Sequence, residues 1–330
     1  SIPDSLSKKF LTYEQASNDD HFIKEKLAHL LPGKWVSTGV SKSGDAALAY
    51  RFYYPNDVDA TVAYGISITT EAEDPRFDDY IKGRRKTEEG QKINEAQINL
   101  LKNKKKLLPL FQKAFEFEKQ DLTNWDLEIL YDYGVLALGV SFWQYYKSLD
   151  DFKSEINMIV EEESKRDGFP ASMKLDTFED RLALFAAYMT MGLISKKMTS
   201  HYYQAFSEGG YYGYEETPFL KYLKLKDYPL SIFAMEPTVF NGKFRQDEKK
   251  WSETKMEKVI FINGDNDPWA VYKIKPAKGL DNLQIMVNNA NHTLKLKDLP
   301  NEDYKNVLLK LNKWLDLNLD VNRSQDESQK

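Results

Sequence analysis

The segment Gly39-Val40-Ser41-Lys42-Ser43-Gly44 lies between a short run rich in β-forming residues at 34–38 and a helical pattern at 45–53. This is the context that the nucleophile elbow G-x-S-x-G requires, because small neighbours tolerate a strained turn from which a serine hydroxyl projects above a sheet. In this interpretation Ser41 is the nucleophile and the backbone N–H of Lys42 is one oxyanion donor. Ser43 stands where the pattern normally has its second glycine, and serine is small enough to keep helix and strand close. The alternative is a Gly/Ser turn without chemistry.

An acyl-transferring serine also needs a base that takes its proton and a carboxylate that fixes the tautomer of that base. Asp267 and His292 each follow a buried-strand pattern, at 258–262 and 283–287, so that both fall at the carboxyl ends of strands. The chain order serine, acid, histidine is that of α/β-hydrolases. We therefore predict a triad of Ser41, Asp267 and His292.

Two alternatives for the triad remain open. Asp265 competes with Asp267, although the position directly before Pro268-Trp269 favours Asp267. A single histidine is more often structural than catalytic, and it is the chain order that favours a catalytic role for His292. The other histidines fall on helical or lid segments and are interpreted as structural or solvated. They are His21, His29 and His201.

The elements that must position these residues alternate between helix and strand. A helix at 10–30, a strand at 34–38, a helix at 45–53 and a strand at 60–68 indicate a parallel sheet. Strand patterns return at 258–262 and 283–287, and a final amphipathic helix is expected at 304–319. The predicted fold class is α/β, with an α/β-hydrolase sheet and a large inserted helical cap.

The region between these strand patterns has a different character. Charged amphipathic stretches dominate residues 75–230, with apolar helices expected at 131–146 and 181–194 and an aromatic, glycine-rich loop at 201–214. We predict a first part of the hydrolase core at 1–74, the cap at 75–230, a second part of the core at 231–321 and a disordered tail at 322–330.

Composition excludes several classes of function. The 330 residues carry 46 basic and 51 acidic side chains, a net charge of −5, without a basic patch, so nucleic acid is excluded as the main partner. The absence of cysteine excludes disulfides, thiolate metal sites and a cysteine nucleophile. No metal or organic cofactor is implied. No apolar run approaches the roughly 18 residues of a transmembrane helix, so no membrane span is expected.

Seven stretches of the sequence carry a resemblance to a known family. They are residues 11–16, 35–42, 54–64, 142–144, 204–212, 264–269 and 291–292. In these stretches the chain resembles the bacterial tripeptidyl aminopeptidase family of serine peptidases, relatives of prolylcarboxypeptidase and dipeptidyl peptidase II. The elbow and Gly264-x-x-Asp267-Pro268-Trp269 are the most specific parts. The resemblance implies a secreted or periplasmic enzyme that removes short peptides from free N-termini, so that its partners are peptide substrates.

Such an aminopeptidase must hold the ammonium group of its substrate. A cation taken out of water needs a carboxylate partner. Glu208, within the matching stretch 204–212, is the candidate, with Gln204 and the neighbouring tyrosines shaping the pocket. The alternative for Glu208 is a structural or solvated acid.

The elbow comes early in this chain. Only 40 residues precede Ser41, with one helix and one strand, whereas several strands precede the elbow of an α/β-hydrolase and one of their loops supplies the second oxyanion N–H. We expect about four strands, on the order of 100 residues, to be missing from the front of the domain. A further N-terminal segment of the same protein is then a possible partner of this chain.

The sequence favours a serine peptidase that releases short peptides, most simply tripeptides, from free N-termini through an acyl-enzyme on Ser41. An esterase or lipase-like hydrolase on the same scaffold is the first alternative. The second is a catalytically silent binding protein, which would result from the missing front of the domain.

Overall fold

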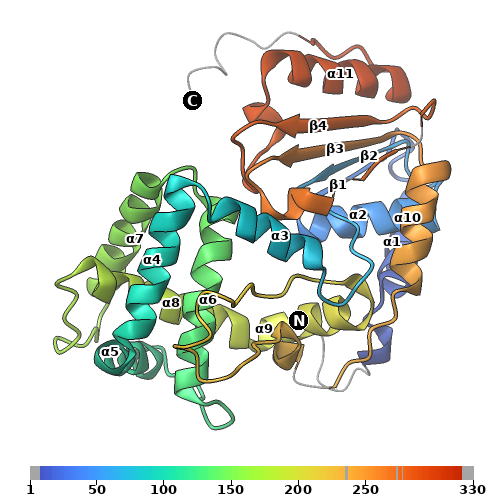
Figure 1. Ribbon diagram of the computed structural model, residues 1–330. Helices are drawn as coiled ribbons and strands as arrows, with labels where there is room; N and C mark the ends of the chain where they lie inside the picture. The colour runs from blue at the N-terminus through green and yellow to red at the C-terminus, as the bar shows by residue number, and fades with distance from the viewer. Residues whose placement is uncertain (1–7, 235–236, 273, 277, 322–330) are drawn as a thin grey trace. The chain divides into compact units, whose positions relative to one another are not determined.

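A computed structural model describes residues 8–234, 237–272, 274–276 and 278–321 (Figure 1). In this part of the chain four strands form one sheet in the order β1-β2-β3-β4, and each neighbouring pair is parallel. The strands are β1 (Val36–Val40), β2 (Ala60–Tyr64), β3 (Val259–Gly264) and β4 (Leu283–Val287). The fold is therefore α/β with a parallel sheet.

Eleven α-helices accompany the sheet in the described residues. They are α1 (Tyr13–Leu27), α2 (Lys42–Tyr53), α3 (Pro75–Arg84), α4 (Glu88–Lys102), α5 (Lys104–Phe117), α6 (Leu127–Tyr145), α7 (Leu149–Ser164), α8 (Phe178–Ile194), α9 (Lys196–Gln204), α10 (Lys243–Thr254) and α11 (Asn301–Leu315). A π-helical turn, η2 (Ala205–Gly209), follows α9 directly. Short 3-10 helices are η1 (Lys8–Phe10), η3 (Leu230–Ala234), η4 (Pro268–Tyr272) and η5 (Leu296–Asp298).

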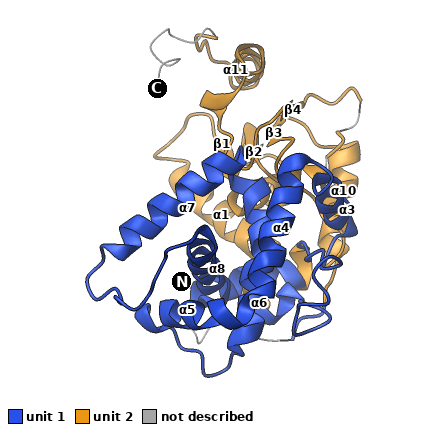
Figure 2. Cartoon of the chain, turned by 60° about the vertical axis from the view of Figure 1, so that its left-hand side comes forward, with its two compact units in different colours: residues 1, 73–206, 211–239 blue, residues 2–72, 207–210, 240–330 orange. Residues whose placement is uncertain are grey.

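The chain divides into two compact units (Figure 2). Unit 1 comprises residues 73–206 and 211–239 and contains the helices α3 to α9. Unit 2 comprises residues 2–72, 207–210 and 240–330 and contains the sheet with α1, α2, α10 and α11. The tail at 322–330, which the sequence predicts to be disordered, lies outside the described residues.

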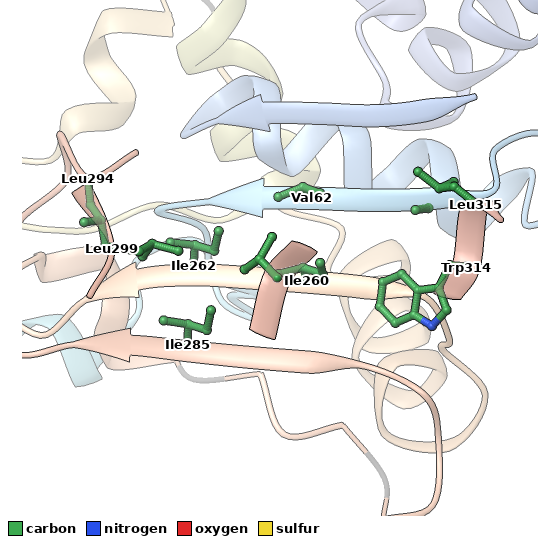
Figure 3. Close-up of a cluster of buried hydrophobic side chains, with 10 residues drawn as sticks. Val62, Ile260, Ile262, Ile285, Leu294, Leu299, Trp314 and Leu315 are labelled. Carbon is green, nitrogen blue, oxygen red and sulfur yellow. The ribbon is translucent and has the colours of Figure 1, made fainter. Parts of the chain in front are cut away.

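The sheet of unit 2 has an apolar core on each face. Alternate residues of β3 serve the two faces: Ile260 and Ile262 belong to the same buried cluster as Trp314 of α11 (Figure 3), whereas Phe261 belongs to the cluster that contains Leu48 of α2. Every residue of β3 is buried, which is usual for an inner strand of a parallel sheet with helices on both faces. Burial of each such side chain contributes about 1.5–3 kcal/mol, so α2 and α11 hold the sheet from its two sides.

Unit 1 is built around the buried helix α6, which packs closely against α8. A side chain at Gly134 of α6 would place its Cβ 2.5 Å from Oγ1 of Thr190 and 2.7 Å from the carbonyl oxygen of Ala186. The one charged residue that α6 buries, Asp132, is paired with Nζ of Lys104 at 2.7 Å. The glycine thus allows the close helix contact, and the ion pair compensates the buried charge.

The bounds of most predicted elements differ by a few residues from those in the structure, and three of these differences bear on the candidate site residues. The first strand runs over Val36–Val40 rather than 34–38, so that it leads directly into Ser41. The second strand ends at Tyr64 rather than at residue 68, because Gly65 turns the chain with a φ of +56°. The predicted loop at 201–214 is wrong in its first half, where α9 continues to Gln204 and is followed by η2.

Candidate active site

Ser41 occupies a strained turn between β1 and α2. Its φ of 56° and ψ of −129° lie in the positive-φ region that residues other than glycine rarely adopt. Its N–H donates to the carbonyl oxygen of Tyr64 in β2 at 2.9 Å, and its own carbonyl oxygen accepts from the N–H of Asp45 at 2.9 Å. The backbone of Ser41 is therefore held on both sides, which is how a strained backbone conformation persists.

Two glycines make this turn possible. A Cβ on Gly39 would lie 2.3 Å from the carbonyl carbon of Ser43, and a Cβ on Gly44 would lie 2.7 Å from both the Gly39 carbonyl oxygen and Cγ2 of Ile66. Ser43 itself is exposed. The close approach of helix and strand therefore falls on Gly44, one position after the usual second glycine, which explains why a serine is tolerated at position 43.

Lys42 is the first residue of α2, where a backbone N–H has no acceptor within the helix. This is the location that oxyanion stabilisation requires of the residue after the nucleophile. The Lys42 side chain turns to the interior, with Nζ 3.8 Å from the centroid of the Tyr13 ring. Burial lowers the pKa of its ammonium group to about 8, against the opposing effect of the Asp45 carboxylate.

Asp267 and His292 form a buried pair beyond the ends of β3 and β4. Oδ2 of Asp267 lies 2.7 Å from Nδ1 of His292, and Oδ1 accepts the N–H of Trp269 at 3.0 Å. Gly264 allows the two loops to meet, because a Cβ there would lie 2.2 Å from the carbonyl oxygen of Ala290. With its proton on Nδ1 facing the carboxylate, the imidazole presents Nε2 as a base.

Asp265 has a different contact from Asp267. Its Oδ1 accepts the backbone N–H of Asn289 at 2.6 Å, which holds the turn that leads from β4 to His292. The carboxylate next to the His292 ring is thus that of Asp267.

Gly65 lies between the Ser41 turn and the Asp267–His292 pair. It follows Tyr64, whose carbonyl binds the N–H of Ser41, and a Cβ at position 65 would lie 2.8 Å from Nδ1 of His292 and 3.3 Å from Oδ2 of Asp267. The ends of the four parallel strands therefore gather Ser41, Asp267 and His292 around one small residue. Sequence reasoning passed over Gly65, although a glycine at the end of a predicted strand was the available signal.

Glu208 lies in η2, and its side chain reaches the start of α1. Its Oε1 accepts the backbone N–H of Tyr13, the first residue of that helix. Burial raises the pKa of the Glu208 carboxyl, while the Tyr13 N–H and the charges of Arg245 and Lys42 act in the opposite direction. Glu208 is thus within electrostatic reach of the residue that follows Ser41. Gln204 is half-buried at the end of α9, in unit 1.

The remaining histidines have the surroundings of structural or solvated groups. His21 places Nδ1 2.6 Å from Oδ2 of Asp57 and stacks on the Tyr54 ring at 4.1 Å. His29 is exposed, and His201 lies on α9 next to Tyr202. Across the described ranges no cluster of three or more His, Asp and Glu side chains could hold a metal ion. Of the helices described, none has both the length and the apolar character to cross a membrane.

A serine on a positive-φ turn between strand and helix, with an Asp–His pair at the ends of later parallel strands, is the arrangement typical of serine hydrolases. Comparison with known proteins gives the particular group. The chain belongs to the PS-10 peptidase S37 family, whose sequence model matches residues 1–318. A prolyl tri/tetrapeptidyl aminopeptidase of Streptomyces mobaraensis is 25% identical to it in an alignment of 314 residues that covers 91% of this chain. The match spans 62% of the length of that relative.

Proposed function

We propose that the protein is a serine peptidase that releases short peptides, tripeptides in the simplest case, from free N-termini through an acyl-enzyme on Ser41. The observation that carries this proposal is the contact of Asp267 with His292 beside the strained turn of Ser41. Membership of a peptidase family and the name of the Streptomyces relative, a prolyl tri/tetrapeptidyl aminopeptidase, support peptides as the substrate class.

The proposed reaction uses each member of the triad in turn. The Ser41 hydroxyl oxygen attacks the scissile carbonyl while its proton passes to Nε2 of His292, and the backbone N–H of Lys42 stabilises the oxyanion. His292 then gives this proton to the leaving amine as the C–N bond breaks. Water then attacks the acyl-enzyme while His292 takes its proton, and His292 returns this proton to Ser41 as the short peptide is released. Asp267 holds the imidazole in the required tautomer throughout.

The fold that we propose around this site is that of an α/β-hydrolase. The parallel order β1-β2-β3-β4 and the elbow after β1 support it. The division into a core of residues 1–74 and 231–321 with a helical cap at 75–230 is part of the same proposal. A secreted or periplasmic location is proposed from the family resemblance alone.

A fluorophosphonate probe and two substrates test this function. Attack of Ser41 on the probe expels fluoride and leaves a stable phosphonyl ester, so mass spectrometry of the digested protein is expected to find the adduct on Ser41. Before labelling, the enzyme is expected to hydrolyse tripeptide amides that have a free N-terminus. It is expected to hydrolyse the N-acetylated versions of these amides much more slowly. Labelling with turnover of simple esters alone would identify an esterase. A folded chain that takes up no label would be a silent binding protein.

We also propose that Glu208 holds the substrate ammonium group. Replacement of Glu208 by Gln keeps an acceptor for the Tyr13 N–H but removes the charge. Because hydrogen bonds to charged groups contribute about 1.5–3 kcal/mol, KM for free-amine tripeptide amides is expected to rise roughly 10- to 100-fold. KM for simple esters is expected to change less than about threefold, since no charged hydrogen bond is lost there. Equal changes for both substrates would show that Glu208 only supports the start of α1.

A further inference from the structure

Arg245 of α10 is buried and uses all its hydrogen-bonding capacity on protein groups. A guanidinium has five N–H donors. Nε donates to the carbonyl oxygen of Gly209 at 2.7 Å, and Nη1 donates to Oδ1 of Asp45 at 2.9 Å and Oε2 of Glu248 at 2.6 Å. Nη2 donates to Oδ2 of Asp45 at 2.5 Å and to the Tyr13 hydroxyl at 2.9 Å. No donor remains for a substrate, so any role of Arg245 in the reaction must be indirect.

Asp45 connects this buried arginine to the nucleophile. The Arg245 fork binds both of its carboxylate oxygens, and the Tyr13 hydroxyl donates to Oδ2 as well. The backbone N–H of Asp45 in turn makes the first hydrogen bond of α2, to the carbonyl oxygen of Ser41. A short path of hydrogen bonds thus runs from α10 through one side chain to the strained residue. The elements concerned, α1, α2 and α10, all belong to unit 2 (Figure 2).

The charges around this path are close to balanced. Three carboxylates, those of Asp45, Glu208 and Glu248, face the cations of Lys42 and Arg245. Burial raises the pKa of Glu248 to about 7, although Arg245 opposes this shift. Burial would also raise the pKa of Asp45, but the Arg245 guanidinium holds it below the usual value. At neutral pH the ion pair between Asp45 and Arg245 therefore persists while Glu248 titrates.

We infer that Arg245 is a positioning residue for Ser41, and that it acts by fixing Asp45 in the first turn of α2. The inference rests on the proposed function of Ser41 as nucleophile. Arginine is required because a bidentate contact fixes the orientation of the carboxylate as well as its charge, which the single ammonium of a lysine does not. A misplacement of about 1 Å at a nucleophile is enough to cost roughly 100-fold in rate.

Replacement of Arg245 by Lys tests this inference, because it keeps the charge and removes the fork. The rate constant of phosphonylation, kinact, is expected to fall about 10- to 100-fold, with the KI of the probe unchanged within about twofold. The probe carries no ammonium group, so a change in substrate binding near Glu208 does not affect this measurement. Arg166→Lys is the matched control, since Arg166 pairs with Glu118 and Glu163 on the surface of unit 1. It is expected to leave kinact unchanged.

Action through Asp45 is tested by a double-mutant cycle. Asp45→Asn is expected to lower kinact by a similar factor, and Arg245→Lys is expected to add less than about threefold in the Asp45→Asn background. Independent, multiplying effects would overturn the inference, as would a normal kinact in the folded Arg245→Lys protein. Tyr13→Phe removes the hydroxyl that bonds Asp45 but keeps the ring on which Lys42 packs, and its kinact is expected to fall about threefold. Failure of the wild-type protein to take up label at Ser41 would instead refute the proposed function.

Discussion

Replacement of Ser41 by Ala is expected to lower kcat for a tripeptide amide by about 10⁴- to 10⁶-fold. Alanine has no hydroxyl group to act as the nucleophile, so acylation is abolished. The remaining rate is that of attack by bound water, assisted by the oxyanion donors. The backbone conformation at position 41, with its positive φ, does not depend on the Ser41 hydroxyl. The turn and substrate binding should therefore survive, with KM or inhibitor affinity within a few fold of wild type. Turnover and the thermal unfolding midpoint check this.

Ser43→Ala is the matched control for this experiment. Ser43 is a serine in the same first turn of α2, but it is exposed, and on the helix it is Gly44 whose missing Cβ leaves room for the Gly39 carbonyl oxygen of β1. Its replacement is expected to change kcat by less than about twofold, in line with other exposed substitutions. Ser41 would not be the nucleophile if the Ser41→Ala protein kept more than one per cent of the wild-type kcat and the fluorophosphonate probe detected no contaminating serine hydrolase in the preparation.

The elbow could be predicted from sequence because its determinants are local. Glycines at fixed spacing, a β-forming run before them and a helical pattern after them are all within 20 residues of Ser41. The same local reasoning failed where tertiary contacts decide. The composition of 201–214 predicts a loop, but burial of Tyr202 supports a helix there, and α9 continues to Gln204. Likewise the β-forming pattern at 60–68 does not reveal that Gly65 must leave the strand to pass the His292 ring.

The buried cluster around Arg245 could not be predicted at all. Its partners Asp45 and Tyr13 lie 200 and 232 residues away in the sequence. Each of these side chains, read alone, fits a solvated helix face, and α10 has the amphipathic pattern of a surface helix. That Asp267 and His292 lie close together was predictable because the carboxyl ends of parallel strands meet at one edge of the sheet. No comparable rule brings a tyrosine of α1 to an arginine of α10.

The Asp267–His292 contact leads to a prediction about the tautomer of His292. In Asp267→Asn the side-chain amide oxygen must take the position of Oδ1, because that atom accepts the N–H of Trp269. The NH₂ group of the asparagine then faces Nδ1 of His292. The imidazole must then accept at Nδ1 and carry its proton on Nε2, where it cannot take the proton of Ser41. Loss of the carboxylate also removes the charge that stabilises the imidazolium. We expect kcat/KM and kinact to fall about 10³- to 10⁴-fold, or about 4–5.5 kcal/mol of transition-state stabilisation.

Asp265→Asn separates this account from the alternative that the sequence left open. Asp265 accepts the Asn289 N–H, an interaction that an asparagine oxygen can keep, so this variant is expected to lose less than about fivefold in kcat/KM. Both proteins should unfold near the wild-type temperature, because neither substitution removes apolar burial. A large loss in Asp265→Asn together with a small loss in Asp267→Asn would identify Asp265 as the acid of the triad. Comparable losses in both would indicate that the loops around His292, rather than its tautomer, determine the rate.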